Sequence, residues 1–130
     1  MGREGAPIDD FSVHVRVSET RATVTVAGDL DVATAPVLRA ELEGLVADGA
    51  RRLIIDLRQV TFIESVALGV IIAAHKQLAG VDDKSLCVVL DPAQTTLRKV
   101  FMVTGLDNVF PVHPTPEAAE GDCADDPPAA

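Results

Sequence analysis

The sequence predicts an α/β fold, a single domain with a mixed, mainly parallel sheet of four to five strands packed by three to four helices. Two segments of alternating hydrophobicity near the start predict an antiparallel hairpin. After them, short runs rich in branched residues alternate with segments of helical periodicity, which is typical of parallel strands joined by right-handed crossovers. The 130 residues suffice for one core.

The first two strands are expected at Phe11 to Val17 and at Arg21 to Ala27. The short link Ser18-Glu19-Thr20 between them favours a hairpin. Residues 1–10 are expected to form a flexible lead-in, and the domain itself is expected to span residues 11–113.

A first helix is expected after the segment Gly28-Asp-Leu-Asp31, which ends the second strand. Thr34 is the expected N-cap, Pro36 lies in the first turn, and Gly49 ends the helix. The apolar face of this helix is formed by Leu38, Leu42, Leu45 and Val46.

The stretch from Leu53 to Leu78 is the centre of the predicted fold. Leu53 to Leu57 reads as a strand covered on both faces, and a turn is expected after it. A helix then runs from Ser65 to about Ala79, where Gly80 marks its end. Its buried face is predicted to contain Leu68, Ile71, Ile72 and His75.

The remaining elements follow the same alternation. Ser85 to Leu90 predicts a buried strand, and Asp91-Pro92 is expected to open a third helix that Gly105 ends. The inner face of that helix is formed by Leu97, Val100 and Phe101. Val109 to Val112 predicts a short last strand. Residues 114–130 are an acidic tail rich in Pro and Ala, with a brief helix expected over Pro116 to Glu120.

The formal net charge of −9 is unevenly distributed, because residues 117–130 hold five acids and no base. This balance argues against a nucleic-acid surface or a basic membrane patch and fits docking onto a basic protein surface. No apolar run is long enough to span a bilayer, and the N-terminal residues lack the apolar segment of a signal peptide. We therefore expect a soluble, cytoplasmic protein.

Four segments carry a family resemblance. They are Gly28-Asp-Leu-Asp31 with Thr34 and Pro36, Ile55-Asp-Leu57 with Val60-Thr-Phe-Ile-Glu-Ser65, Ala67-Leu-Gly69, and Thr104-Gly-Leu-Asp-Asn-Val-Phe-Pro111. In this order and spacing they resemble the STAS domain of bacterial anti-sigma factor antagonists, over roughly Phe11 to His113.

The resemblance implies a regulatory binding module without enzymatic activity or cofactor. Members of that family bind an anti-sigma factor, commonly a serine kinase of the GHKL type, and so release a sigma factor for transcription. The kinase phosphorylates the serine that aligns with Ser65, which blocks binding, and a phosphatase reverses this. The family loop reads Asp-Ser-Ser-Gly-Leu-Gly, whereas this chain reads Glu64-Ser-Val-Ala-Leu-Gly69.

The resemblance assigns the partner-binding surface to two neighbouring loops and the start of the helix after them. The residues expected there are Asp29, Asp31, Thr34, Glu64, Ser65, Val66, Ala67, Leu68 and Gly69. Two alternatives stay open: Ser65 could act only as a helix N-cap, and Asp31 could form only a turn with the amides near Thr34. A phosphate on Ser65 would add about −1.5 to −2 charges, and it would affect binding more than stability.

The histidines and cysteines are considered separately. His14, His75 and His113 are scattered, and no ligand spacing predicts a metal site. Cys87 and Cys123 are either two incidental thiols or a redox pair that forms a disulfide and controls partner binding.

The alternative function is a STAS module of another assembly, either a stress-signalling scaffold or a nucleotide-responsive sensor.

Overall fold

The computed structural model describes residues 3–4, 11–78 and 84–122 of the chain. Six strands form one sheet in the order of the sequence, with each strand beside the next. They are β1 (Arg3–Glu4), β2 (Ser12–Ser18), β3 (Arg21–Leu30), β4 (Arg52–Ile63), β5 (Ser85–Val89) and β6 (Val112–His113). The pairs β1–β2 and β2–β3 are antiparallel, and the three pairs from β3 to β6 are parallel. The α/β class and the mixed, mainly parallel sheet are thus confirmed.

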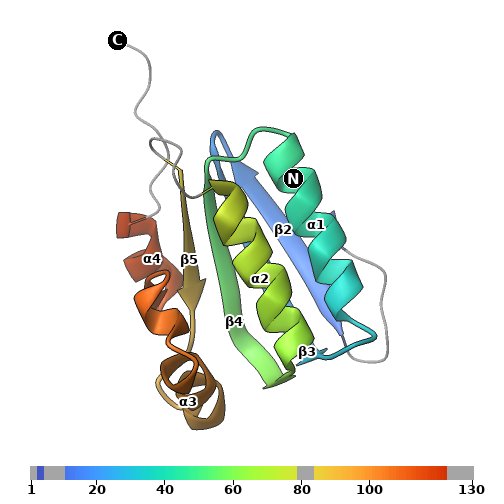
Figure 1. Ribbon diagram of the computed structural model, residues 1–130. Helices are drawn as coiled ribbons and strands as arrows, with labels where there is room; N and C mark the ends of the chain where they lie inside the picture. Colours follow the sequence, from blue (N-terminus) through green and yellow to red (C-terminus); the bar gives the residue numbers. More distant parts are fainter. Residues whose placement is uncertain (1–2, 5–10, 79–83, 123–130) are drawn as a thin grey trace.

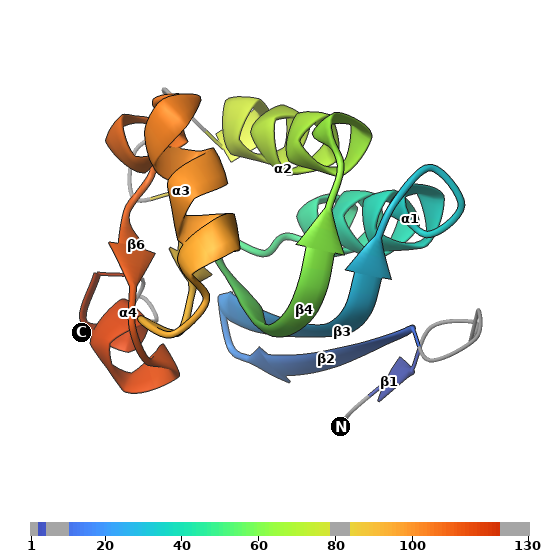
Figure 2. The same cartoon turned by 90° about the horizontal axis from the view of Figure 1, so that it is seen from below.

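In the described part of the chain, four α-helices and one 3-10 helix accompany the sheet. They are α1 (Ala35–Ala47), α2 (Ser65–Leu78), α3 (Thr95–Val103), η1 (Leu106–Asn108) and α4 (Pro116–Asp122). Helices α1 and α2 lie side by side on one face of the sheet, and α4 lies on the opposite face (Figures 1 and 2). The site discussed below lies at the end of the sheet where α1 and α2 begin.

The core between the sheet and helices α1 and α2 is aliphatic, as a chain with 3% aromatic residues requires. Buried Val24 and Ile55 from the central strands belong to the same cluster as Leu42 of α1 and Ile71 of α2. Leu68 is buried as predicted, whereas Ile72 and His75 are only half-buried. The aromatic contribution is small: Phe110 packs edge-to-face against Phe101 and against the ring of His75.

The main difference from the predicted elements is the length of β4, which runs to Ile63 instead of ending at Leu57. Its register with β3 shifts twice, between Thr25 and Ala27 and again between Gly28 and Asp29. Both shifts are bulges that place an extra residue on β4, so that the alternation expected of a strand is lost there. No separate turn precedes α2, because only Glu64 separates the strand from the helix.

The C-terminal third also differs in detail. Helix α3 begins at Thr95 instead of Asp91-Pro92, because Asp91 forms a turn. In this turn the Asp91 carboxylate accepts a hydrogen bond of 2.8 Å from the Ala93 amide. The last strand is Val112–His113 and not Val109 to Val112. Residues 109 and 110 continue the turn of η1, because their amides donate hydrogen bonds of 3.0 and 3.2 Å to the Leu106 carbonyl. Gly105 ends α3 with a φ of 76°, as predicted.

The short helix expected at Pro116 exists and reaches Asp122. Its buried residue Ala119 packs in a cluster with Ile54, Cys87 and Val89 on the face of the sheet opposite α1 and α2. This part of the predicted tail therefore packs against the sheet. Of the predicted flexible lead-in, Arg3–Glu4 pairs with β2, while residues 1–2, 5–10 and 123–130 and the predicted helix end at Gly80 lie outside the described residues.

Candidate functional site

The candidate site is the corner where the parallel strands β3 and β4 end and lead into α1 and α2. Asp29 lies opposite Phe62 in the strand register, and Leu30 lies opposite Ile63. Immediately after β4, the Glu64 amide donates a hydrogen bond of 2.8 Å to the Leu30 carbonyl. Loops at the carboxyl ends of parallel strands are common binding sites. The two predicted loops are therefore adjacent.

Asp31 organises the loop between β3 and α1. Its Oδ1 accepts hydrogen bonds from the amides of Ala33 (2.9 Å) and Thr34 (3.0 Å). The hydrogen bond from the Thr34 amide, together with that from Ala33, lowers the pKa of the Asp31 carboxyl below its ordinary value. The turn that had been one of two alternatives for Asp31 is present.

Thr34 occupies the N-cap position of α1, but its hydroxyl makes no cap hydrogen bond to the helix. The hydroxyl instead donates to the Asp29 carbonyl at 2.7 Å and accepts from the Asp31 amide at 2.8 Å. Thr34 is buried, so its side chain stabilises the loop from inside. The first turn of α1 contains Pro36, as predicted.

Asp29 connects the two strands near the corner. Its Oδ1 accepts a hydrogen bond of 2.6 Å from the Thr61 hydroxyl across the β3–β4 pair. Both side chains are exposed, so this carboxylate is accessible as well as held in place. Asp29 and the Asp31 turn therefore form an acidic edge beside the start of α2.

Ser65 is the first residue of α2, and the N-cap position belongs to Glu64. The Glu64 carbonyl accepts the amides of Ala67 (3.0 Å) and Leu68 (3.3 Å), which starts the helical pattern. Ser65 is exposed, and within the described part of the chain no hydrogen bond engages its hydroxyl. This geometry leaves the hydroxyl accessible and does not support the alternative in which Ser65 serves only as the cap.

The other residues predicted in the α2 part of the surface divide by burial. Val66 and Gly69 are exposed, and Glu64 is half-buried. Ala67 and Leu68 are buried and belong to the core cluster. On the helix they fall on the face turned toward the sheet, and their part in a partner contact stays a prediction.

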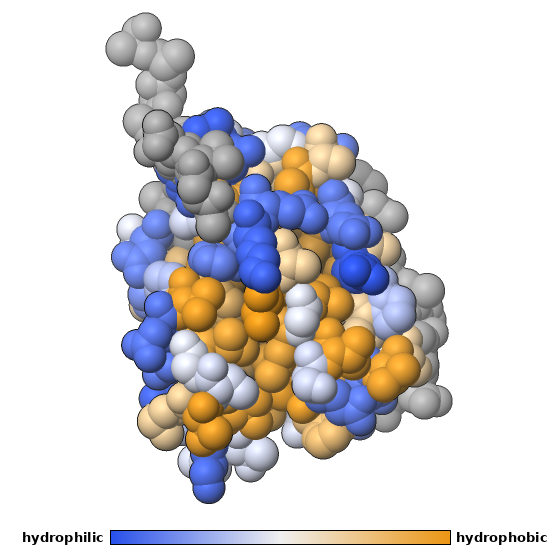
Figure 3. All heavy atoms as spheres, viewed as in Figure 1, coloured by the Kyte–Doolittle hydropathy of each residue, from blue (hydrophilic) through white to orange (hydrophobic). Residues whose placement is uncertain are grey.

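Three exposed apolar side chains surround the corner. Val32 in the β3–α1 loop is 70% exposed, Phe62 at the end of β4 is 50% exposed, and Val66 in α2 is 43% exposed. Figure 3 shows apolar surface gathered over the end of this face where α1 and α2 begin. We call Val32, Phe62 and Val66 the corner patch. Val32 and Phe62 were not among the predicted site residues, because the bulges that turn Phe62 outward leave no periodic signal.

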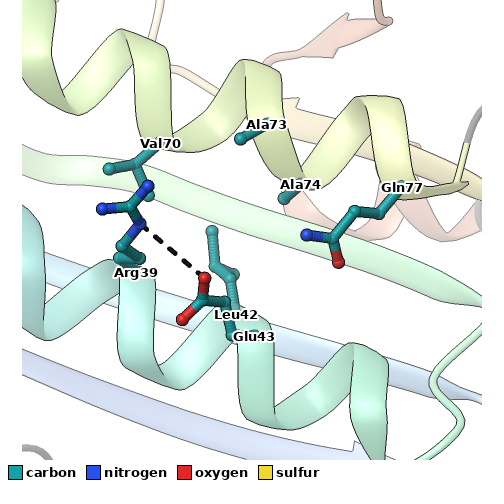
Figure 4. Close-up of a pocket in the computed structure, with 7 residues that line it drawn as sticks. All are labelled: Arg39, Leu42, Glu43, Val70, Ala73, Ala74 and Gln77. Atoms are coloured by element: carbon teal, nitrogen blue, oxygen red, sulfur yellow. Dashed lines mark ion pairs between the residues drawn. The ribbon is translucent and has the colours of Figure 1, made fainter.

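A shallow groove between α1 and α2 extends away from the corner along the helices (Figure 4). Leu42 and Glu43 line it from α1, while Val70 and Ala73 line it from α2. The Arg39 Nε lies 3.7 Å from the Glu43 carboxylate across one helical turn, and both side chains are more than half exposed. The groove thus combines apolar side chains with an exposed ion pair.

Cys87 is not part of this corner. Cys87 is fully buried in β5 beneath α4 and is disulfide-bonded. The sequence contains one further cysteine, Cys123, which directly follows the last residue of α4 and lies outside the described residues.

Comparison with known proteins places this geometry in a family. The model of the STAS domain matches residues 12–119. The chain belongs to the STAS domain family. This match runs from the start of β2 into α4 and therefore covers the whole corner.

Similar STAS proteins are described as anti-sigma factor antagonists. The anti-sigma-B factor antagonist of Bacillus subtilis is 32% identical over 103 residues, which cover 79% of this chain and 91% of that protein. BtrV of Bordetella bronchiseptica, described as an anti-sigma factor antagonist, is 36% identical over 92 residues, covering 71% of this chain and 77% of that protein. The crystal structure of an anti-sigma factor antagonist from Mycobacterium paratuberculosis superposes with a TM-score of 0.79 at 33% identity, covering 93% of this chain and 99% of the other.

One structural observation bears on the expected location of the protein. Among the helices of the described residues, none combines the length and the apolar character needed to cross a membrane.

Proposed function

We propose that this STAS protein is an anti-sigma factor antagonist that binds an anti-sigma factor through the corner of β3, β4 and α2. Binding would occupy the anti-sigma factor and release its sigma factor for transcription. The similar proteins from Bacillus subtilis and Bordetella bronchiseptica are described as anti-sigma factor antagonists. The observation that supports it most directly is the corner patch beside an exposed Ser65 on a rigid backbone.

The corner has the composition expected of a protein-binding site. Exposed Val32, Phe62 and Val66 supply apolar area that monomeric surfaces rarely gather in one place. The exposed Asp29 carboxylate lies at the edge, and the chain as a whole carries a net charge of −9. An apolar centre beside acidic groups fits a partner surface with apolar pockets and basic residues around them.

We further propose that phosphorylation of Ser65 controls this binding, with the partner being an anti-sigma factor of the serine-kinase type and a phosphatase reversing the change. The side chain at the first helical position of α2 is accessible, and the positive end of the helix dipole stabilises a phosphate there. The same charge would disfavour a contact that excludes water from Val66 and Phe62. Phosphorylation would therefore weaken binding while leaving the fold intact.

A binding comparison tests the proposed function. Purified candidate anti-sigma factors are titrated with the wild-type chain, Ser65→Glu, Ser65→Ala and Ala118→Glu. Ala118 is exposed in the first turn of α4 on the opposite face of the sheet, so Ala118→Glu adds the same charge in the first turn of a helix away from the corner. Ala118 is the third residue of α4, whereas Ser65 is the first residue of α2, so the control matches the added charge and the helical first turn. We expect wild type, Ser65→Ala and Ala118→Glu to bind, and Ser65→Glu to bind at least about tenfold more weakly.

Two results would count against this assignment. Binding of no candidate anti-sigma factor by the wild type would remove the proposed function. Equal weakening by Ser65→Glu and Ala118→Glu would show that charge acts without regard to position. For the phosphorylation itself, mass spectrometry after incubation with a kinase-type anti-sigma factor and ATP should find phosphate on Ser65 and none in Ser65→Ala.

We also propose that the redox state of Cys87 and Cys123 modulates the protein. Oxidation would join the two thiols, passing two electrons and two protons to an oxidant such as hydrogen peroxide, which becomes two molecules of water. Support comes from the disulfide-bonded state of Cys87 and from the position of Cys123 directly after α4 in the sequence. Because α4 packs on the face of the sheet opposite α1 and α2, the bridge would fix α4 and would change binding through the sheet, without covering the Ser65 corner.

Peptide mapping without reductant tests this redox proposal. After treatment with mild peroxide, a peptide pair linking Cys87 to Cys123 is expected, and reductant should separate it. Two free thiols after that treatment would refute the pairing. A bridged chain that binds the anti-sigma factor as the reduced chain does would refute its role in control.

A further inference from the structure

Three side chains with metal-binding atoms meet at the edge of the sheet formed by β5, β6 and α4. Sγ of Cys87, a ring nitrogen of His113 and a carboxylate oxygen of Asp122 all lie within 4.8 Å of one another. Nε2 of His113 is 2.7 Å from Oδ2 of Asp122. Each residue comes from a different element, and none belongs to the Ser65 corner.

The fold dictates this convergence. His113 lies opposite Val89 in the parallel register of β5 and β6. Cys87 precedes Val89 by two residues, so the side chains of Cys87, Val89 and His113 lie on one face of the sheet. Helix α4 then returns over that face, with Ala119 packed against Cys87 and Val89, and its last residue is Asp122.

The donor set has the chemistry of a zinc ligand set. Zn²⁺ binds thiolate sulfur at about 2.3 Å and imidazole nitrogen or carboxylate oxygen at about 2.0 to 2.2 Å, in a tetrahedron. At those bond lengths neighbouring ligand atoms are roughly 3.3 to 3.8 Å apart. Three atoms already within 4.8 Å need only small side-chain movements to reach that geometry.

The three ligand side chains become more exposed from Cys87 to His113 to Asp122. Cys87 is fully buried, whereas the side chain of His113 is 19% exposed and that of Asp122 is 55% exposed. An ion could therefore reach the site from the Asp122 side, and a fourth coordination position would remain for water. A partly open three-ligand arrangement of this kind is common for zinc.

We propose that the reduced protein binds one zinc ion through Cys87, His113 and Asp122. In this structure the Cys87 sulfur is disulfide-bonded, so that the oxidised chain would lack the thiolate that the site needs. Zinc binding would displace the thiol proton of Cys87, and the ion would take the place of the hydrogen bond between His113 and Asp122. The site would also hold β5, β6 and α4 together. This proposal is independent of anti-sigma factor binding.

Zinc binding by the full-length chain tests the proposal. The chain, reduced with a phosphine, is titrated with ZnCl₂ against a chromophoric chelator, and Co²⁺ serves as a spectroscopic probe. We expect one Zn²⁺ per reduced chain, a thiolate-to-cobalt charge-transfer absorption, and a higher melting temperature with zinc. The oxidised chain should show none of these.

Four variants complete the design. Cys87→Ala and His113→Ala should lose stoichiometric binding, and Asp122→Asn should weaken it at least about tenfold, the scale seen even for groups that only orient metal ligands. Asp122 is exposed, so its variant should fold even if the buried Cys87→Ala does not. The matched control His14→Ala, which changes an exposed histidine of β2, should bind as wild type.

Two results would overturn the zinc proposal. Failure of the reduced wild type to retain zinc would overturn the proposal. So would wild-type affinity in both His113→Ala and Asp122→Asn. Either result would leave the proposed binding of an anti-sigma factor untouched.

Discussion

At Ser65 the same added charge has opposite consequences for the helix and for a partner. The residue opens α2, where backbone amides are oriented toward an anion, and it lies beside the exposed Val66. A phosphate there would be well tolerated by the folded chain and poorly tolerated by an apolar contact. The residue that begins the helix is therefore well suited to a change in binding that costs little stability.

Asp31 predicts a pH dependence of stability. Its carboxyl pKa is lowered from the ordinary value of 3.8 by hydrogen bonds from the Thr34 and Ala33 amides. A depressed pKa in the folded state contributes stability above the unfolded value, and that contribution is lost as the pH falls through the folded value. We expect wild type to exceed Asp31→Asn in urea midpoint at pH 7, and the two midpoints to converge below about pH 4.

Asn is the informative replacement because it keeps an acceptor for the same amides but does not titrate. The urea midpoints are measured at a series of pH values. A gap between wild type and Asp31→Asn that stays constant from pH 7 into acid would contradict the assignment of the low pKa to the folded loop.

Among the elements, β4 supports the corner with its outer half, which pairs with β3 but no longer with β5. Pairing with β5 ends at Asp56, whereas pairing with β3 continues to Ile63. The side-chain amide of Gln94, just before α3, donates hydrogen bonds of 2.9 Å to the carbonyls of Leu57 and Val60. Gln94 thus supplies donors where β5 no longer does.

Replacement of Gln94 by Ala should therefore loosen the end of β4. It removes both hydrogen bonds to β4 and a third, at 2.7 Å, that the Gln94 Oε1 accepts from the Asp91 amide. We expect a loss of about 1 to 3 kcal/mol in the free energy of unfolding and faster amide exchange near Val60 and Ile63. The exposed Gln59 offers the control: Gln59→Ala should change neither quantity appreciably.

A second element-level prediction concerns α4. Ala119 is fully buried against Ile54, Cys87 and Val89, whereas Ala118 beside it is exposed. Ala119→Glu would place a charge in that apolar cluster and should release α4, with a loss of about 1 to 3 kcal/mol in the free energy of unfolding. Limited proteolysis should then cut after β6 in Ala119→Glu and not in Ala118→Glu. Equal resistance of the two variants would show that α4 is not held by this contact.

The elements also show what the sequence could and could not predict. The branched run of residues 53–57 predicted the buried half of β4, and Gly49 and Gly105 marked helix ends correctly. The outer half of β4 was missed, because two bulges replace the period of two by a buried residue at every third position, Val60 and Ile63. The same bulges hid the exposure of Phe62.

Clusters of side chains that depend on strand register and helix packing could not be predicted from the sequence for a similar reason. Cys87, His113 and Asp122 are separated by 26 and 9 positions in the sequence, and they meet only because β5 and β6 pair in parallel and α4 folds back. Conversely, the adjacency of the Asp31 loop and Ser65 was predictable, since parallel neighbouring strands end at the same edge of a sheet. What was missed at that corner is which side chains point outward.

For the whole molecule, the two faces of the sheet would have separate tasks. One face carries α1, α2 and the corner patch, and the other carries α4 with the Cys87 cluster (Figure 2). Substitutions on one face can therefore be made with the other as a control. The division also implies that binding and stability can be changed independently at the corner, because its exposed apolar residues contribute little to the core.

Phe62→Ala provides that separation. Half of the Phe62 side chain is exposed at the centre of the proposed contact, and aromatic residues in such positions often dominate binding energy. We expect the affinity for the anti-sigma factor, measured by calorimetry, to fall at least about tenfold while the melting temperature changes by no more than a few degrees. Met102→Ala, which removes an even more exposed apolar side chain (63%) from α3, should leave the affinity unchanged. If Met102→Ala weakened binding and Phe62→Ala did not, the partner would bind near α3 instead of the corner of β3, β4 and α2.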